Sequence, residues 1–260
     1  MSRLMTCLPF SDTKPLATVD LFCLTYAGGS TAVYRDWNRL FPDWISVRPV
    51  EYPGRGTRMG ERLESNPARL ADQLLAELRP HLARPFALFG HSLGAALGYR
   101  IALGLMESLP PLAFFPSGRH SPDCEDPAPK RAHLDDAGLL DEVRALNGSP
   151  REVLDNRELM ALLLPIIRSD FRLSETIRAE RDARPLACPL HVFGGTGDPE
   201  VPVEGIGRWR TVAAGDFSQT LIEGDHFFLH HAGHVQTIAD RIAAVLAPLA
   251  ASQPAARRRA

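Results

Sequence analysis

The sequence lacks any close pairing of cysteines. Its 260 residues include four cysteines, at positions 7, 23, 124 and 188, and none of them forms a Cys-x-x-Cys pair. Cysteines this far apart indicate neither a disulfide framework nor a zinc site. Cys23 lies in an apolar run, which is typical of a small buried hydrophobic residue.

The sequence also lacks an excess of positive charge and long apolar runs. Its formal net charge is −2, so no overall attraction to nucleic acid or to an anionic membrane is expected. The apolar runs are far shorter than the ~20 residues of a membrane-spanning helix. The N-terminus has no apolar core of the kind found in signal peptides. These features predict a soluble cytoplasmic protein that binds neither nucleic acid nor membrane.

What remains is an ordinary globular composition, with 45% hydrophobic and 23% charged residues. Short apolar runs alternate with amphipathic stretches, and this alternation predicts a parallel sheet covered by helices. The runs that predict strands are residues 21–26, 45–52, 86–89, 112–116, 190–193 and 219–222. The stretches that predict helices on the sheet are residues 67–82, 93–106 and 235–249.

The alternation breaks between residues 117 and 189. A proline-rich piece is followed by two helical patterns, at residues 133–146 and 151–168, the second with a possible continuation to residue 182. An insertion of this kind between two sheet strands predicts a helical lid over an active site. We therefore expect one domain over residues 1–250, with a core at 18–116 and 190–250, a lid at 117–189 and a disordered tail at 251–260.

The motif with the clearest chemistry is Gly-His-Ser-Leu-Gly at residues 90–94. It matches Gly-x-Ser-x-Gly and lies between a predicted strand and a predicted helix. This context is typical of the nucleophile elbow of α/β-hydrolases, in which a sharp strand-to-helix turn exposes the serine hydroxyl. A serine that merely caps a helix is the alternative. Ser92 is the predicted nucleophile.

The serine requires a base, and in α/β-hydrolases the histidine comes last in the chain. His226 follows the last predicted strand after a three-residue turn, at the end of the sheet where sites form. His226, His230 and His234 are also spaced four apart, as metal ligands on one helix would be. No His-Glu-x-x-His pattern accompanies them, so we predict His226 as the base and expect no metal.

The base requires an acid that orients it. Asp198 follows the predicted strand at residues 190–193 after the turn Gly-Gly-Thr-Gly, whose glycines permit tight bending. Asp123 and Asp126 follow an earlier strand and are the alternatives. The glycine-rich turn and the late position favour Asp198.

An oxyanion hole needs two backbone N–H groups. Leu93, the residue after the nucleophile, supplies one of them. The second is expected in the loop Tyr-Ala-Gly-Gly-Ser at residues 26–30, where we assign it to Ala27. A phosphate-binding loop is excluded here because no Gly-Lys-Ser/Thr follows the glycine pair.

Several strings together resemble one family. They are residues 26–30, the string Tyr-Pro-Gly-Arg-Gly at 52–56, residues 90–94, 117–119, Arg-Ser-Asp-Phe at 168–171, 194–198 and 224–227. This set is similar to the type II thioesterases that accompany polyketide and non-ribosomal peptide synthetases. The resemblance extends from about residue 21 to residue 249. The string at 52–56 is the most discriminating, since general lipases and esterases lack it.

The resemblance implies a fold, an activity and a partner. The fold is an α/β-hydrolase with a mostly parallel sheet and a helical lid. The activity is hydrolysis of acyl thioesters on the phosphopantetheine arm of carrier proteins, with Ser92, Asp198 and His226 as triad and no cofactor. Alternatives are a carboxylester hydrolase for small esters, an acyltransferase or cyclase, and an inactive fold that docks partners. The intact triad argues against the last of these.

Overall fold

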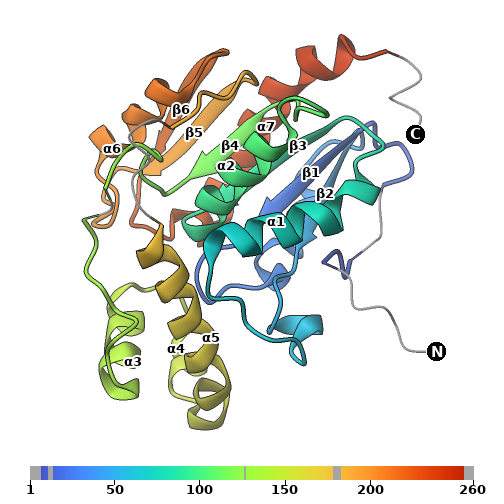
Figure 1. Cartoon of the computed structure of the whole chain (residues 1–260). Coiled ribbons are helices and arrows are strands. Elements are labelled where there is room, and N and C mark those ends of the chain that lie inside the picture. Colours follow the sequence, from blue (N-terminus) through green and yellow to red (C-terminus); the bar gives the residue numbers. More distant parts are fainter. Residues whose placement is uncertain (1–6, 11–13, 126, 178–182, 255–260) are drawn as a thin grey trace, which may run out of the picture.

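The computed structural model describes residues 7–10, 14–125, 127–177 and 183–254 and contains a six-stranded sheet (Figure 1). Every neighbouring pair of strands is parallel. The strands are β1 (Val19–Leu24), β2 (Ile45–Val50), β3 (Phe86–His91), β4 (Phe114–Ser117), β5 (Leu190–Gly195) and β6 (Phe217–Ile222). All six predicted strands are confirmed, with ends that differ by up to two residues. The predicted parallel α/β architecture is confirmed with them.

The order of the strands determines where a site can form. The sheet runs β2-β1-β3-β4-β5-β6, so the chain builds outward from β1 in one direction and then crosses to β3 on its other side. The loops that follow β1 and β3 therefore part at this point and leave a crevice beyond the carboxyl ends of the two strands. The predicted oxyanion loop follows β1, and the predicted nucleophile follows β3.

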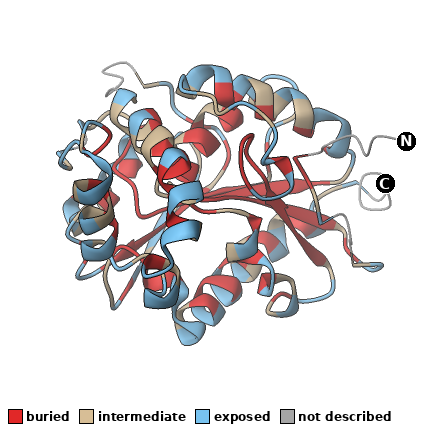
Figure 2. Ribbon diagram, turned by 90° about the horizontal axis from the view of Figure 1, so that it is seen from below, coloured by how far each residue is buried: buried red, intermediate tan, exposed pale blue. Residues whose placement is uncertain are grey.

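Two apolar layers cover the sheet. Alternate strand residues point to opposite faces, so Phe22 and Leu24 belong to one buried cluster, and Leu21 and Cys23 to the other. On the first face lie α1 (Pro67–Leu78) and α2 (Leu93–Leu105), and α7 (Ala232–Ala251) packs on the second. Figure 2 shows the result as buried strands between helices that are exposed on their outer sides.

The helical insertion lies at one end of the sheet (Figure 1). It contains α3 (Asp136–Ala145), α4 (Arg151–Leu154) and α5 (Arg157–Thr176). The predicted helix at residues 151–168 is wrong in its boundaries: it divides at Asn156, whose side chain accepts the N–H of Leu159 and caps α5. The predicted continuation reaches residue 182, and residues 178–182 lie outside the described residues.

Smaller elements were not predicted. They include α6 (Val203–Gly207) and several 3-10 turns, among them Thr31–Tyr34 and Trp37–Arg39. Helix α7 continues to Ala251, and residues 255–260 of the predicted tail lie outside the described part of the chain. Among the described residues, no helix combines the length and the apolar character that crossing a membrane requires.

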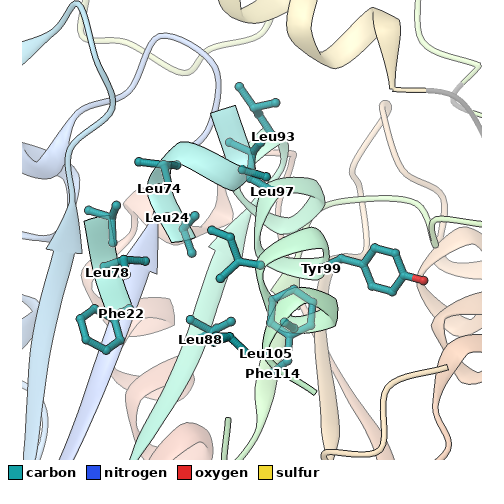
Figure 3. Packing of buried hydrophobic residues seen from close by; sticks show 14 of the residues in the cluster. Phe22, Leu24, Leu74, Leu78, Leu88, Leu93, Leu97, Tyr99, Leu105 and Phe114 are labelled. Atoms are coloured by element: carbon teal, nitrogen blue, oxygen red, sulfur yellow. The ribbon is translucent and has the colours of Figure 1, made fainter. Parts of the chain in front are cut away.

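The packing of α1 on the sheet generates a prediction about stability. The Leu74 side chain is fully buried between α1 and the strands (Figure 3). Replacing it with alanine leaves a cavity, so Leu74→Ala should lower the free energy of unfolding by about 2–5 kcal/mol in urea titrations. Leu162→Ala is the matched control because Leu162 is 63% exposed. A similar loss in both variants would contradict this account of the core.

Candidate active site

The serine at the end of β3 has a strained backbone. Ser92 has φ 53° and ψ −116°, a conformation that L-residues rarely adopt. The turn leaves no room on either side: a Cβ on Gly90 would lie 2.2 Å from the carbonyl oxygen of Gly94, and one on Gly94 would lie 2.3 Å from that of Leu24. These two contacts explain both glycines of the motif. The predicted nucleophile elbow has this geometry.

Helix α2 begins immediately after Ser92. The first N–H groups of a helix have no partner within it and carry partial positive charge. The N–H of Leu93 is the first of them. The N–H of Ser92 donates to the carbonyl of Ser117 on β4 at 2.8 Å, which fixes the elbow against the neighbouring strand.

Asp198 and His226 meet in space although 28 residues separate them. The Nδ1 atom of His226 lies 2.8 Å from Oδ2 of Asp198, and the aspartate side chain is fully buried. The other carboxylate oxygen accepts the N–H groups of Glu200 at 2.8 Å and Val201 at 3.2 Å. The carboxylate is therefore held from both sides. Since it occupies Nδ1, the nitrogen of His226 that remains for chemistry is Nε2.

The alternative acids have other surroundings. Asp123 accepts hydrogen bonds from Arg208 and Thr211 at 3.2 and 3.0 Å. Asp126 lies outside the described residues. Asp225, next to His226 in the sequence, accepts the N–H of Phe227. Among the described residues, only Asp198 forms a hydrogen bond with the His226 ring.

The remaining histidines near the site have structural partners. His230 Nε2 lies 2.8 Å from the hydroxyl of Tyr26, and His234 Nδ1 lies 3.1 Å from the carbonyl of Phe228. His191 pairs with Ser218 and Thr220 of β6. Within the described residues, no group of three or more histidines, cysteines or acids has the arrangement of a metal site.

His91 is a buried neighbour of His226. Their ring centroids are 5.1 Å apart, and Nδ1 of His91 lies 2.9 Å from the Ser117 hydroxyl. Burial, together with the nearby His226 and His230, lowers the pKa of His91 well below its usual value. Burial likewise lowers the pKa of His230. Both lowered pKa values favour the neutral form of these two rings.

The loop after β1 contains Ala27. Its Gly28 has φ +77°, a conformation that suits glycine, and its Gly29 N–H donates to the carbonyl of Tyr26 at 3.0 Å. The Gly28 N–H donates to Oδ2 of Asp170, on α5, at 2.7 Å. Asp170 in turn pairs with Arg55. Both charged residues lie in strings that carry the family resemblance, at 52–56 and 168–171, but no role was predicted for either of them.

A cavity of about 1410 Å³ connects these groups. Ser92, His226 and Ala27 line it, as do apolar residues of the insertion. The latter are Val143, Leu146, Val153, Met160, Leu163 and Ile167. A chamber with one reactive end and a long apolar wall fits a ligand that combines a reacting carbonyl with an apolar chain.

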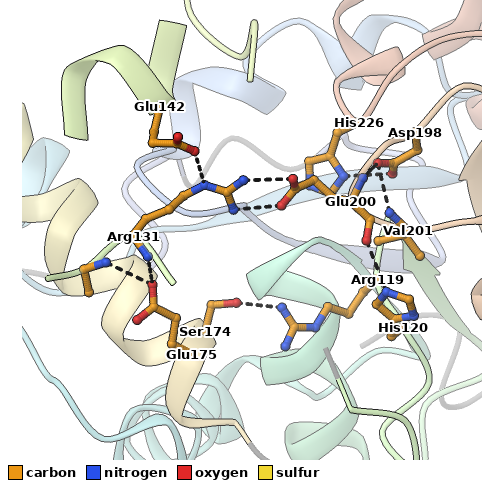
Figure 4. A network of polar contacts seen from close by, with 11 residues as sticks. Arg119, His120, Arg131, Glu142, Ser174, Glu175, Asp198, Glu200, Val201 and His226 are labelled. Atoms are coloured by element: carbon orange, nitrogen blue, oxygen red, sulfur yellow. Dashed lines mark hydrogen bonds and ion pairs between the residues drawn. The ribbon is translucent and has the colours of Figure 1, made fainter. Parts of the chain in front are cut away.

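A polar network joins the insertion to the Asp198 loop (Figure 4). Arg131 donates to both carboxylate oxygens of Glu200, at 2.8 and 2.9 Å, and to Glu142 of α3 at 2.9 Å. The backbone N–H of Arg131 donates to Glu175 of α5 at 2.5 Å. Glu200 also donates its own N–H to Asp198. The insertion is thus attached to the loop that carries the candidate acid.

Comparisons with known proteins agree with this geometry. The family model described as a thioesterase domain matches residues 19–246. The linear gramicidin dehydrogenase LgrE of Brevibacillus parabrevis is 39% identical, over 82% of this chain and 83% of its own. The thioesterase PikA5 of Streptomyces venezuelae is 33% identical, over 85% of this chain and 79% of its own.

A solved structure extends the likeness to three dimensions. The type II thioesterase BorB from the borrelidin biosynthetic cluster superposes with a TM-score of 0.81 at 34% identity. The match covers 89% of this chain and 94% of BorB. The resemblance inferred from the motifs is therefore confirmed. The chain belongs to the thioesterase family, and within it to the type II thioesterases of the α/β-hydrolase fold.

Proposed function

We propose that this protein is a cytoplasmic editing enzyme that hydrolyses acyl thioesters on the phosphopantetheine arm of carrier proteins. The observation that carries the proposal is that His226, paired with Asp198 at 2.8 Å, lines the same cavity as Ser92, whose backbone is strained. Nucleophile, base and orienting acid are the parts that double displacement needs.

The first half of the reaction transfers the acyl group to the enzyme. Nε2 of His226 takes the proton of Ser92 as the Oγ atom forms a bond to the thioester carbonyl carbon. When the tetrahedral intermediate collapses, the carbon–sulfur bond breaks and the proton passes from His226 to the leaving thiolate. Asp198 holds the imidazole in the required tautomer and stabilises its charged form.

The second half releases the acid. His226 takes a proton from water, the water oxygen attacks the acyl-serine carbonyl, and the proton returns to the Ser92 oxygen. In both halves the N–H groups of Ala27 and Leu93 stabilise the oxyanion. No metal, nucleotide or other cofactor takes part in these steps.

The carrier-bound substrate is supported by the cavity and by the relatives. An acyl chain on a phosphopantetheine arm is long and thin, and the cavity of about 1410 Å³ has a reactive end and apolar walls. LgrE and BorB are named for the linear gramicidin and borrelidin systems. We extend the link with assembly lines to this chain, and we assign α3–α5, within residues 117–189, the role of a lid that admits the arm and excludes bulk water.

Removal of the nucleophile tests the proposal directly. Ser92→Ala should abolish hydrolysis of acyl-pantetheine thioesters, by roughly 10⁶-fold in kcat, because no covalent intermediate forms. Circular dichroism verifies that the variant is folded. Oxygen esters with matched acyl chains serve as the comparison in the wild type. Retained thioesterase activity in folded Ser92→Ala, or a preference for the oxygen esters, would contradict the proposed function.

Exchange of the acid tests the orienting group. Asp198→Asn should lower kcat on the order of 10⁴-fold, because the amide favours the wrong tautomer of His226. Asp123→Asn is the matched control, since Asp123 contacts Arg208 and Thr211 instead. Steady-state kinetics with one thioester suffice. If Asp123→Asn proved the more damaging change, the acid would have to be reassigned.

The lid offers a matched pair of residues on α3. Val143 lines the cavity, whereas Leu139 is fully buried in the apolar cluster between α3 and α5. Val143→Ala should change the ratio of kcat/KM for long and short acyl chains, because it enlarges the chamber. Leu139→Ala should lower the melting temperature and leave that ratio unchanged. Equal effects of both variants on all chain lengths would remove the substrate-contacting role from α3.

A further inference from the structure

A buried ion pair lies behind the loop that contains Ala27. Arg55 donates to both oxygens of Asp170, at 2.5 and 2.8 Å, and the two residues are 115 positions apart. The aspartate side chain is fully buried and that of Arg55 is 4% exposed. Burying two charges is costly unless hydrogen bonds satisfy them. A contribution to stability alone therefore does not explain why this pair is buried here.

Both members of the pair form hydrogen bonds with the backbone of the loop. Oδ2 of Asp170 also accepts the N–H of Gly28 at 2.7 Å, and the Arg55 guanidinium donates to the carbonyl of Gly29 at 3.3 Å. Hydrogen bonds to a charged partner are stronger than neutral ones, and the bond to Gly28 is the shorter of the two. Two consecutive residues of the loop are thus fixed by one ion pair, and each bond joins a different partner of that pair.

Fixing these residues also fixes the direction of the Ala27 N–H. In a trans peptide the C=O of one residue and the N–H of the next point in opposite directions. The carbonyl of Tyr26 accepts the Gly29 N–H inside the turn, so the Ala27 N–H points out of the turn. The Gly28 N–H, on the following peptide, is held by Asp170. Hydrogen bonds therefore restrain the peptide groups on both sides of Ala27.

The string at residues 52–56 presents the arginine of this pair. Gly54 and Gly56 both have positive φ, +78° and +51°, and a Cβ on Gly56 would lie 1.9 Å from the Glu51 carboxylate. The Tyr52 ring lies 5.0 Å from the Arg55 guanidinium, and its hydroxyl donates to the carbonyl of Thr25 at 2.9 Å. Neighbouring Glu51 accepts the N–H and the hydroxyl of Thr31. Three side chains from residues 51–55 thus hold the loop from Thr25 to Thr31.

Asp170 connects this loop to the insertion. It belongs to α5, and a Cβ on Gly28 would lie 2.8 Å from Cγ1 of Ile167 on the same helix, so loop and helix are in direct contact. Ile167 also lines the cavity. A displacement of α5 would therefore pull on the Gly28 N–H through Asp170.

We propose that Arg55 and Asp170 are positioning residues that orient the Ala27 N–H toward the developing oxyanion. Because Asp170 belongs to α5, this orientation depends on how α5 packs against the loop. This inference rests on the proposed function. Neither residue is among those that line the cavity. Their effect reaches the reaction only through the backbone of residues 27–29.

The primary variant is Asp170→Asn, which keeps the size of the side chain and removes its charge. Since it leaves Arg55 buried without a counter-charge, the double variant Arg55→Gln/Asp170→Asn is made beside it. Arg168→Met is the matched control: Arg168 lies on the same helix and donates to the carbonyls of Ala132 and Leu134 and to Asp136, and none of these is in the loop.

Kinetics provide the first readout. Outright removal of an oxyanion donor costs about 10²–10³-fold in kcat, so a misaimed donor should cost on the order of 10-fold to 10²-fold, with KM for a short acyl-pantetheine thioester little changed. An alkyl boronic acid, which forms a tetrahedral adduct with an active serine, should bind more weakly by a similar factor. Arg168→Met should alter neither quantity in this way. A fall in melting temperature with unchanged kcat and boronate affinity would overturn the proposal.

Amide hydrogen exchange, followed by NMR, provides a readout that needs no turnover. The Gly28 amide, which donates to Asp170, should exchange faster in Asp170→Asn and in the double variant than in the wild type and in Arg168→Met. Unchanged exchange would show that Asp170 does not restrain the loop and would overturn the proposal, even if activity were lost. If the wild type hydrolysed no thioester, the proposed function would fail, and the exchange result would still decide whether Asp170 holds the loop. Equal acceleration in Arg168→Met would assign the effect to general loosening of the insertion and would also overturn the proposal.

Discussion

The tight turn between β3 and α2 is the constraint on which the site depends. It forces Ser92 to φ 53°, and it requires that no side chain stand at Gly90 or Gly94, whose backbones lie against each other and against Leu24. Strain of this kind persists only where the surroundings over-determine it. Here β3 is central, paired with β1 on one side and β4 on the other, and both neighbours contact the elbow. The interior of the sheet therefore stabilises the conformation that exposes the hydroxyl.

The elbow leaves the other groups to be supplied by independent loops. Because all the strands are parallel, their carboxyl ends lie at one edge of the sheet. The loops after β1 and β6 bring Ala27 and His226 to the same cavity as Ser92, and the loop after β5 brings Asp198 to His226. This arrangement explains why short motifs could predict a candidate site. Each motif lies directly after a strand, and the apolar strand runs could be recognised without knowledge of the tertiary structure.

The helix boundaries of the insertion and its long-range ion pairs were not predicted from the sequence. The division of the insertion at Asn156 was missed, although the polar residues at 155–158 interrupt the apolar pattern there. The pairing of Arg55 with Asp170 and of Arg131 with Glu200 joins residues 115 and 69 positions apart. No periodicity encodes such pairs. The sequence shows which residues are charged but not which of them pair. The packing of the insertion on the core decides which charged residues are buried together.

Those two ion pairs attach the insertion to two loops of the candidate site. At one attachment, Asp170 of α5 accepts a hydrogen bond from the loop after β1. At the other, Arg131 reaches Glu200, whose own N–H donates to Asp198 (Figure 4). Apolar contacts alone would let the helices slide, because dispersion and burial have little directional preference. Charge-assisted hydrogen bonds are directional, so they favour one position of the insertion on the core. In that position the loops that carry Ala27 and Asp198 are both restrained, although neither ion pair includes a residue of the proposed triad.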